Sequence, residues 1–95
     1  MLEQLKERVN REIEELKKEW LEQSKEYLLD NAYKIAIITD FEYLPFDEME
    51  EEQIETLLEQ ENVIGFLWDE WMNSNGFNTF DVLDDFFKYL INDRI

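Results

Sequence analysis

Carboxylates are the side chains of this sequence that could do chemistry, and they are concentrated in one stretch, residues 47–61. That stretch holds eight Asp or Glu residues and no Lys or Arg. It lies within a longer run, residues 35–87, that has fifteen acids and no base. Charge of one sign opposes compaction, but it also creates an outward field that attracts an oppositely charged partner. The stretch therefore indicates binding to a basic partner.

The spacing of five of these carboxylates fits one helix face. Most successive members are three or four residues apart, which in a helix would place them about 5–6 Å apart: Glu48, Glu51, Glu52, Glu55 and Glu59. Duplex DNA carries one charge per about 1.7 Å of its axis, and an Arg-lined DNA groove would accept such a row through forked, charge-assisted hydrogen bonds. The alternative is a solvated face that only keeps the protein soluble.

Further acidic residues could extend this surface. Asp47 is expected to cap the helix, with Glu50 three residues later. The other candidates lie in the last third of the chain: Asp69, Glu70, Asp81, Asp84 and Asp85.

Catalysis and metal binding have little support. The chain has no His and no Cys, so the commonest catalytic bases and nucleophiles are missing. The segment 73–76 resembles the middle of an EF-hand loop, but Trp71 and Val82 then occupy the first and last ligand positions. We expect no enzyme activity, no metal and no cofactor.

The length and charge limit the kinds of protein that this chain can be. Ninety-five residues suffice for one domain, 1–95, and 44% hydrophobic residues argue against disorder despite a net charge of −16. Seven of the nine bases lie in residues 1–34, so most of the negative charge belongs to the rest. The lack of Cys, of a signal peptide and of a long apolar run predicts a cytoplasmic protein. The acidic surface would repel nucleic acid and anionic membranes, so we expect no direct binding to either.

The hydrophobic pattern predicts an all-α fold, a small bundle of about five helices with a long N-terminal helix (1–29) and an acidic helical body (30–95). An apolar stripe at helical spacing predicts one helix over residues 2–28: Leu2, Leu5, Val9, Ile13, Leu16 and Trp20. Such a helix would be about 40 Å long, whereas a domain of this size has a radius of gyration near 12 Å. It would therefore pack along the body or serve as a self-association arm.

Four more helices are expected after a break near Asp30 and Asn31. They cover residues 32–44, ended by Pro45; residues 47–61; a short helix capped by Asn62; and residues 79–92. The last has two apolar stripes, so it is buried on both sides or offers one stripe to a partner. Most aromatic side chains are expected in the core, with Trp71 and Phe77 as candidate exposed anchors for a partner.

Three motifs carry a family resemblance: residues 28–35 (LLDNAYKI), Leu57-Leu58 with 62–64 (NVI), and 68–71 (WDEW). They resemble a small, uncharacterised domain family of phages and mobile elements of Gram-positive bacteria. The resemblance implies that such domains are encoded on mobile elements together with counter-defence proteins. The family has no catalytic motif that could be transferred to this chain. The charge is similar to that of DNA-mimic inhibitors, including anti-CRISPR and anti-restriction proteins.

Three functional hypotheses follow. The first is an acidic inhibitor of a nucleic-acid-binding defence protein, with a Cas9-type effector favoured as the partner, acting at the site that reads the PAM duplex. The second is a non-enzymatic interaction module, antitoxin-like or an assembly subunit, that binds through apolar helix faces such as the stripe of Phe86. The third is a homodimer formed through the N-terminal helix.

Overall fold

The computed structural model describes residues 1–74 and 82–95, and every regular element in these ranges is helical. The α-helices are α1 (Leu2–Leu21), α2 (Lys25–Asp30), α3 (Ala32–Asp40), α4 (Glu51–Leu58), α5 (Val63–Ser74) and α6 (Val82–Tyr89). Shorter helical turns are η1 (Phe41–Tyr43), η2 (Phe46–Glu48) and the π-helical η3 (Leu90–Arg94). The predicted all-α fold with a long N-terminal helix is confirmed, and the described ranges contain no strand.

The N-terminal helix is shorter than predicted. α1 ends at Leu21, and α2 begins at Lys25. Ser24 makes the break, because its hydroxyl accepts a hydrogen bond of 3.1 Å from the N–H of Tyr27 and so caps α2. An N-cap residue has extended backbone angles, so a helix cannot continue through it. One helix over residues 2–28, or over 1–29, is therefore wrong.

The most apolar stretch of the chain is helical, as predicted, in α3. Asn31 separates α2 from α3, which agrees with the expected break. α3 stops at Asp40, and the chain tightens into η1 before Leu44 becomes extended. Pro45 disfavours helical angles in the residue before it, so the predicted end at this position is confirmed.

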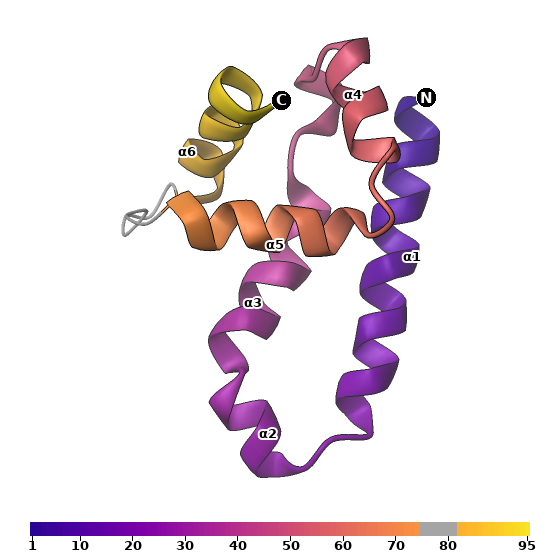
Figure 1. Ribbon diagram of the computed structural model, residues 1–95. Coiled ribbons are helices and arrows are strands. Elements are labelled where there is room, and N and C mark those ends of the chain that lie inside the picture. Colours follow the sequence, from indigo (N-terminus) through magenta and orange to yellow (C-terminus); the bar gives the residue numbers. More distant parts are fainter. Residues whose placement is uncertain (75–81) are drawn as a thin grey trace.

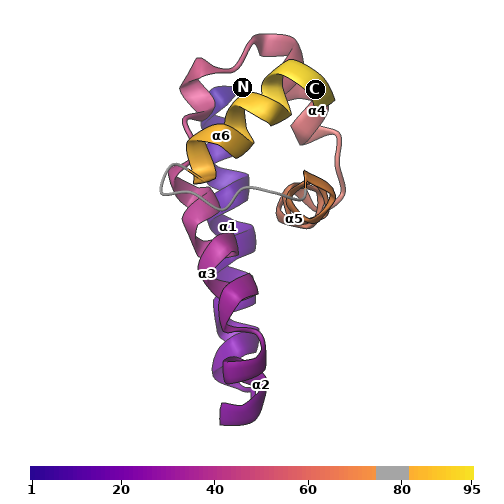
Figure 2. The same ribbon diagram turned by 90° about the vertical axis from the view of Figure 1, so that its left-hand side faces the viewer.

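Figures 1 and 2 show a head from which a hairpin of helices projects. The head contains the start of α1 together with α4, α5 and α6, and α5 crosses the middle of the molecule. α1 runs away from the head, and the chain returns through α2 and α3. We call residues 14–34, which form this hairpin, the arm. The molecule measures 40 × 29 × 18 Å along its principal axes.

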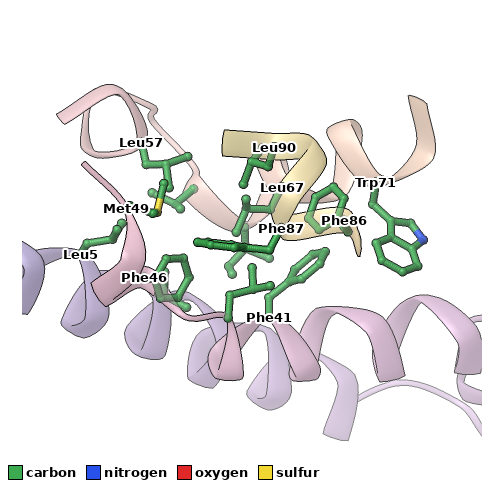
Figure 3. Close-up of a cluster of buried hydrophobic side chains, with 14 of the residues drawn as sticks. Leu5, Phe41, Phe46, Met49, Leu57, Leu67, Trp71, Phe86, Phe87 and Leu90 are labelled. Carbon is green, nitrogen blue, oxygen red and sulfur yellow. The ribbon is translucent and has the colours of Figure 1, made fainter. Parts of the chain in front are cut away.

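One hydrophobic cluster holds the head together (Figure 3). α1 contributes Leu5, Val9 and Ile13, and every other described helical element except α2 supplies at least one buried side chain. Removing such apolar surface from water is the main favourable contribution to folding. Much of the apolar stripe of the N-terminal helix is thus buried in the head, since Leu5, Val9 and Ile13 are at most 1% exposed.

Three aromatic rings form the centre of the contact between η1, α5 and α6. The ring of Phe86 lies 5.8 Å from that of Phe41 and 5.2 Å from that of Trp71, and Phe41 and Trp71 are 6.3 Å apart. The two contacts of Trp71 are edge-to-face, an arrangement that aromatic quadrupoles favour. Trp71 also donates a hydrogen bond of 2.9 Å to the Tyr33 hydroxyl, which fixes α5 to the start of α3.

The start of α5 depends on two side chains. Asn62 caps the helix as predicted, since its Oδ1 accepts a hydrogen bond of 2.7 Å from the N–H of Gly65. A Cβ at Gly65 would lie 3.2 Å from both Cγ and Oδ1 of Asn62, so the glycine leaves room for this cap. Glu12 of α1 supplies the other acceptor, as described below.

The C-terminal segment is fixed to α5 by an ion pair. Glu70 is buried, and its two oxygens accept hydrogen bonds of 2.6 Å from Nε and 3.0 Å from Nη2 of Arg94. These bonds, and then the charge of Glu70, raise the pKa of Arg94 above its ordinary value. No helix in the described residues is long and apolar enough to cross a membrane.

Candidate protein-binding surface

The acidic segment, residues 47–61, does not form the single helix that the sequence predicts. Asp47 and Glu48 belong to η2, the chain is extended at Met49 and Glu50, and only then does α4 begin. Met49 is buried in the core, which draws the chain inward at this point. The helix cap is Glu50 rather than Asp47, because Glu50 forms a capping box with Gln53. The predicted Asp47 cap is therefore wrong.

All eight carboxylates of the acidic segment are exposed to solvent. They are Asp47, Glu48, Glu50, Glu51, Glu52, Glu55, Glu59 and Glu61. None of them forms an ion pair with the residues that the structure describes, where the ion pairs are Arg8–Glu12, Arg11–Glu15, Lys17–Glu14, Lys88–Asp84 and Arg94–Glu70. The segment therefore presents negative charge to solvent without an internal counter-charge.

The carboxylates form a row along part of the segment only. Glu51, Glu55 and Glu59 follow one another at intervals of four residues along α4 and its C-cap. At 1.5 Å per residue this gives a spacing of about 6 Å and a row about 12 Å long. Glu52 lies beside the row, whereas Glu48 is separated from α4 by the extended residues. The row is shorter than predicted.

Two contacts outside the segment hold α4 in place. The guanidinium of Arg8 donates to the carbonyl of Leu58 (2.7 Å), to that of Gln60, and to that of Glu61 (2.6 Å). A cation here satisfies free carbonyls at the C-terminal end of the helix and complements its dipole. At the other end, Nε2 of Gln53 donates a hydrogen bond of 2.7 Å to the carbonyl of Ile91. The exposed carboxylates thus stand on a helix fixed at both ends.

A groove of about 640 Å³ lies next to the acidic segment, between α1 and the chain around η1 and η2. Asp47 lines it together with Glu7, Glu42 and Tyr43, and Lys6 is the one base in its lining. Tyr43 is 77% exposed. Carboxylates beside an aromatic ring can hold the cationic side chain of a Lys or Arg.

Two predicted members of the binding surface are buried instead. Glu70 is 6% exposed because it pairs with Arg94, and Trp71 is 5% exposed because it packs with Phe41 and Phe86. Neither side chain is available to a partner in this fold. The sequence shows both on an amphipathic helix but does not show that the C-terminus returns to cover them.

The remaining predicted residues that the structure describes belong to other helices than the acidic segment. Asp69 on α5 is exposed, and so are Asp84 and Asp85 in the first turn of α6. That turn is at the end of α6 farther from α4 (Figure 1). Asp84 pairs with Lys88 at 3.1 Å. Asp81 and Phe77 lie outside the described residues.

The apolar stripe of the last helix on which the second hypothesis depends is not exposed to a partner. Phe86 is fully buried, and Phe87 is 1% exposed, although they lie on the two different stripes. The helix is therefore buried on both sides, which is the first of the two alternatives that the sequence leaves open.

Sequence reasoning missed the most highly connected carboxylate, Glu12. Its Oε1 accepts from the N–H of Ile64 (2.8 Å), and its Oε2 accepts from the N–H of Val63 (3.2 Å) and from Nε of Arg8 (3.0 Å). Glu12 thereby caps α5 while its neighbour Arg8 caps α4. The available signal was a charge inside the apolar stripe, between Val9 and Ile13.

No metal site is evident in the two ranges that the structure describes, where no three potential ligands come together. No protein-family model, curated protein or solved structure matches the chain.

Proposed function

We propose that this chain is a non-enzymatic binding protein whose acidic segment occupies a basic, nucleic-acid-binding groove of another protein and so inhibits it. The observation that carries the proposal is the state of the eight carboxylates of residues 47–61. All are exposed, and none forms an ion pair with the described residues. A chain that needed charge only for solubility would be expected to mix both signs on this surface.

The chemistry of recognition is the replacement of phosphates by carboxylates. The row formed by Glu51, Glu55 and Glu59 has a spacing of about 6 Å, which suits forked hydrogen bonds from arginines of a partner. The groove lined by Asp47 and Tyr43 offers a place for one more cationic side chain. Association would be electrostatically steered, and therefore fast and sensitive to salt.

The rigidity of the segment supports the same proposal. Arg8 fixes the C-terminal end of α4, and Gln53 joins its start to Ile91. A surface that is already ordered loses less conformational entropy when it binds. A flexible acidic tail would lose more of its binding free energy in this way.

The partner that we favour is a Cas9-type effector in the cytoplasm of a bacterial host. This choice depends on the similarity in charge to DNA-mimic inhibitors and on the resemblance to phage and mobile-element domains. Effectors of this class read the PAM duplex with arginines that contact guanines. A row of carboxylates held in place of the duplex would block that site.

The test is a binding measurement between this chain and a Cas9–guide complex, at 0.1 M and 0.5 M NaCl and with a competing PAM-containing duplex. Binding should weaken steeply with salt and be displaced by the duplex. The double variant Glu51→Lys/Glu55→Lys should bind at least about tenfold more weakly, a change of about 1.4 kcal/mol. A matched control is Glu14→Lys/Glu15→Lys on α1, which changes the net charge equally at exposed positions of the arm.

Equal losses in the two double variants would contradict a specific role for the acidic segment. Binding that neither salt nor the duplex affects would point to an apolar interface instead. Failure of the Cas9–guide complex to bind at 0.1 M NaCl would rule out this partner.

A further inference from the structure

The arm has an unusual distribution of apolar side chains. No residue between Glu14 and Lys34 is buried, although this segment includes seven large hydrophobic residues: Leu16, Trp20, Leu21, Tyr27, Leu28, Leu29 and Tyr33. Three of them are mostly exposed, namely Leu21 at 85%, Leu29 at 77% and Tyr33 at 61%. Tyr27 is 40% exposed. The tip of the arm, residues 21–29, thus exposes the apolar side chains of Leu21, Tyr27 and Leu29.

α2 is so short that exposed apolar side chains on it are unexpected in an isolated molecule. α2 has six residues and no buried side chain. Helices shorter than about 12 residues are marginal in water unless an apolar face is packed. The Ser24 cap assists the helix, but it hides no apolar surface. A partner that covers Leu21 and Leu29 would supply the missing burial.

We infer that the tip of the arm is the surface through which two copies of this chain associate, end to end. The first argument is charge. The arm has six acids and four bases, a net charge of −2, whereas residues 35–95 have sixteen acids and two bases, a net charge of −14. Two copies of a chain with a net charge of −16 therefore repel each other less at the arm than at residues 35–95.

The second argument is the position of the arm. It projects from one end of a molecule that is 40 Å long, and the acidic segment lies in the head at the other end (Figures 1 and 2). When two arms meet at their tips, the two heads point in opposite directions. Their separation then exceeds the Debye length, about 8 Å at physiological salt, so their repulsion is screened.

The third argument is the mixture of charges around the apolar residues. Lys18 and Lys25 form no ion pair with the described residues, and neither do Glu19, Glu22 and Glu26. A two-fold interface brings each residue of one copy opposite a different residue of the other, reciprocally. A surface with unpaired lysines and glutamates can therefore pair with itself. A strongly basic partner would instead be drawn to the acidic head.

The expected dimer is weak. Two leucines and one tyrosine per copy (Leu21, Leu29 and Tyr27) cover less than the roughly 800 Å² per partner of a standard stable interface, so we expect a dissociation constant on the order of 100 µM. Salt should strengthen the dimer, because it screens the repulsion between the two touching arms, each with a net charge of −2, while the apolar contact remains. This response is opposite to that expected for the acidic segment and its partner, so the two proposals can fail separately.

Sedimentation equilibrium of the full chain tests this inference over 5 µM to 1 mM, at 0.05 M and 0.5 M NaCl. The mass should rise from 11.7 kDa towards twice that value, at lower concentration in the higher salt. Leu21→Ser/Leu29→Ser should raise the dissociation constant at least about tenfold without changing the helical circular dichroism. Tyr43→Ser is the matched control, since Tyr43 is 77% exposed outside the arm, and it should leave the dimer unchanged.

Single cysteines test the geometry, because the chain has none of its own. Under mild oxidation, Lys25→Cys at the arm should form covalent dimers much faster than Glu59→Cys in the head. A monomer at 1 mM in both salts would overturn the inference and leave the apolar tip to a different protein. A dimer that survives Leu21→Ser/Leu29→Ser, or faster cross-linking of Glu59→Cys, would overturn it as well.

Discussion

Glu12 and Glu55 are the same residue type, each inside an α-helix, and the structure uses them in opposite ways. Glu12 is 9% exposed and accepts hydrogen bonds from Arg8 and from two backbone N–H groups of α5. Glu55 is exposed and forms no ion pair with the described residues. A buried carboxylate is tolerated only when it is fully paired. An exposed one remains free to bind something else.

The same contrast separates two groups of acidic residues. Glu12 and Glu70 join distant segments, α1 to the start of α5 and α5 to the C-terminus. The carboxylates of the acidic segment form no ion pair in the described fold, and Glu50 only caps its own helix, α4. We conclude that the first group stabilises the protein and that the second group is available for function. Three substitutions test this division, from the largest expected effect to the smallest.

Glu12→Ala should have the largest effect. It would leave two N–H groups of α5 without an acceptor and Arg8 without its carboxylate, so we expect a loss of about 3 kcal/mol in the free energy of unfolding. Urea denaturation followed by circular dichroism measures this change. Glu15→Ala, three residues later on α1 and 67% exposed, should change the free energy by less than about 0.5 kcal/mol. Similar losses in both variants would show that the hydrogen bonds of Glu12 to α5 contribute no more to stability than an exposed carboxylate does.

Glu70→Ala should have an intermediate effect. The variant loses two hydrogen bonds to Arg94, but that guanidinium is already 46% exposed and can be hydrated, so we expect a loss of about 1.5 kcal/mol. Its exposed neighbour provides the control, since Asp69→Ala should be close to neutral. Thermal unfolding of the two variants compares them directly, and an equally large loss for Asp69→Ala would contradict the assignment of Glu70.

Glu55→Gln/Glu59→Gln should have the smallest effect on stability, and its sign should be opposite. Removal of two like charges relieves repulsion within the acidic segment, so we expect a gain of about 0.5 kcal/mol or less at 0.05 M salt. The gain should disappear at 0.5 M salt, where the repulsion is screened. A clear loss of stability in this variant would show that the acidic segment also supports the fold.

The class of the fold and the main helices could be predicted from local properties of the chain. Apolar spacing predicted a long N-terminal helix, the lack of a second strand favoured a helical Ile35–Ile38, and Pro45 predicted the end of that segment. The Asn62 cap was predictable for the same reason, since a cap and the N–H that it accepts from are three residues apart. The exposure of the eight carboxylates in residues 47–61 also followed, because unpaired carboxylates are rarely buried.

Which carboxylates and aromatic side chains are buried depends on how the helices pack, and the sequence did not show it. Glu12 and the N–H of Val63 are 51 residues apart, and Glu70 and Arg94 are 24 residues apart. No local pattern indicates that such pairs meet, because their contact depends on how the helices pack. The same limit explains why the sequence predicts Trp71 as an exposed anchor and Glu70 as part of the acidic surface, although both are buried. Periodicity shows which side of a helix is apolar, but only packing decides which of its residues remain in contact with water.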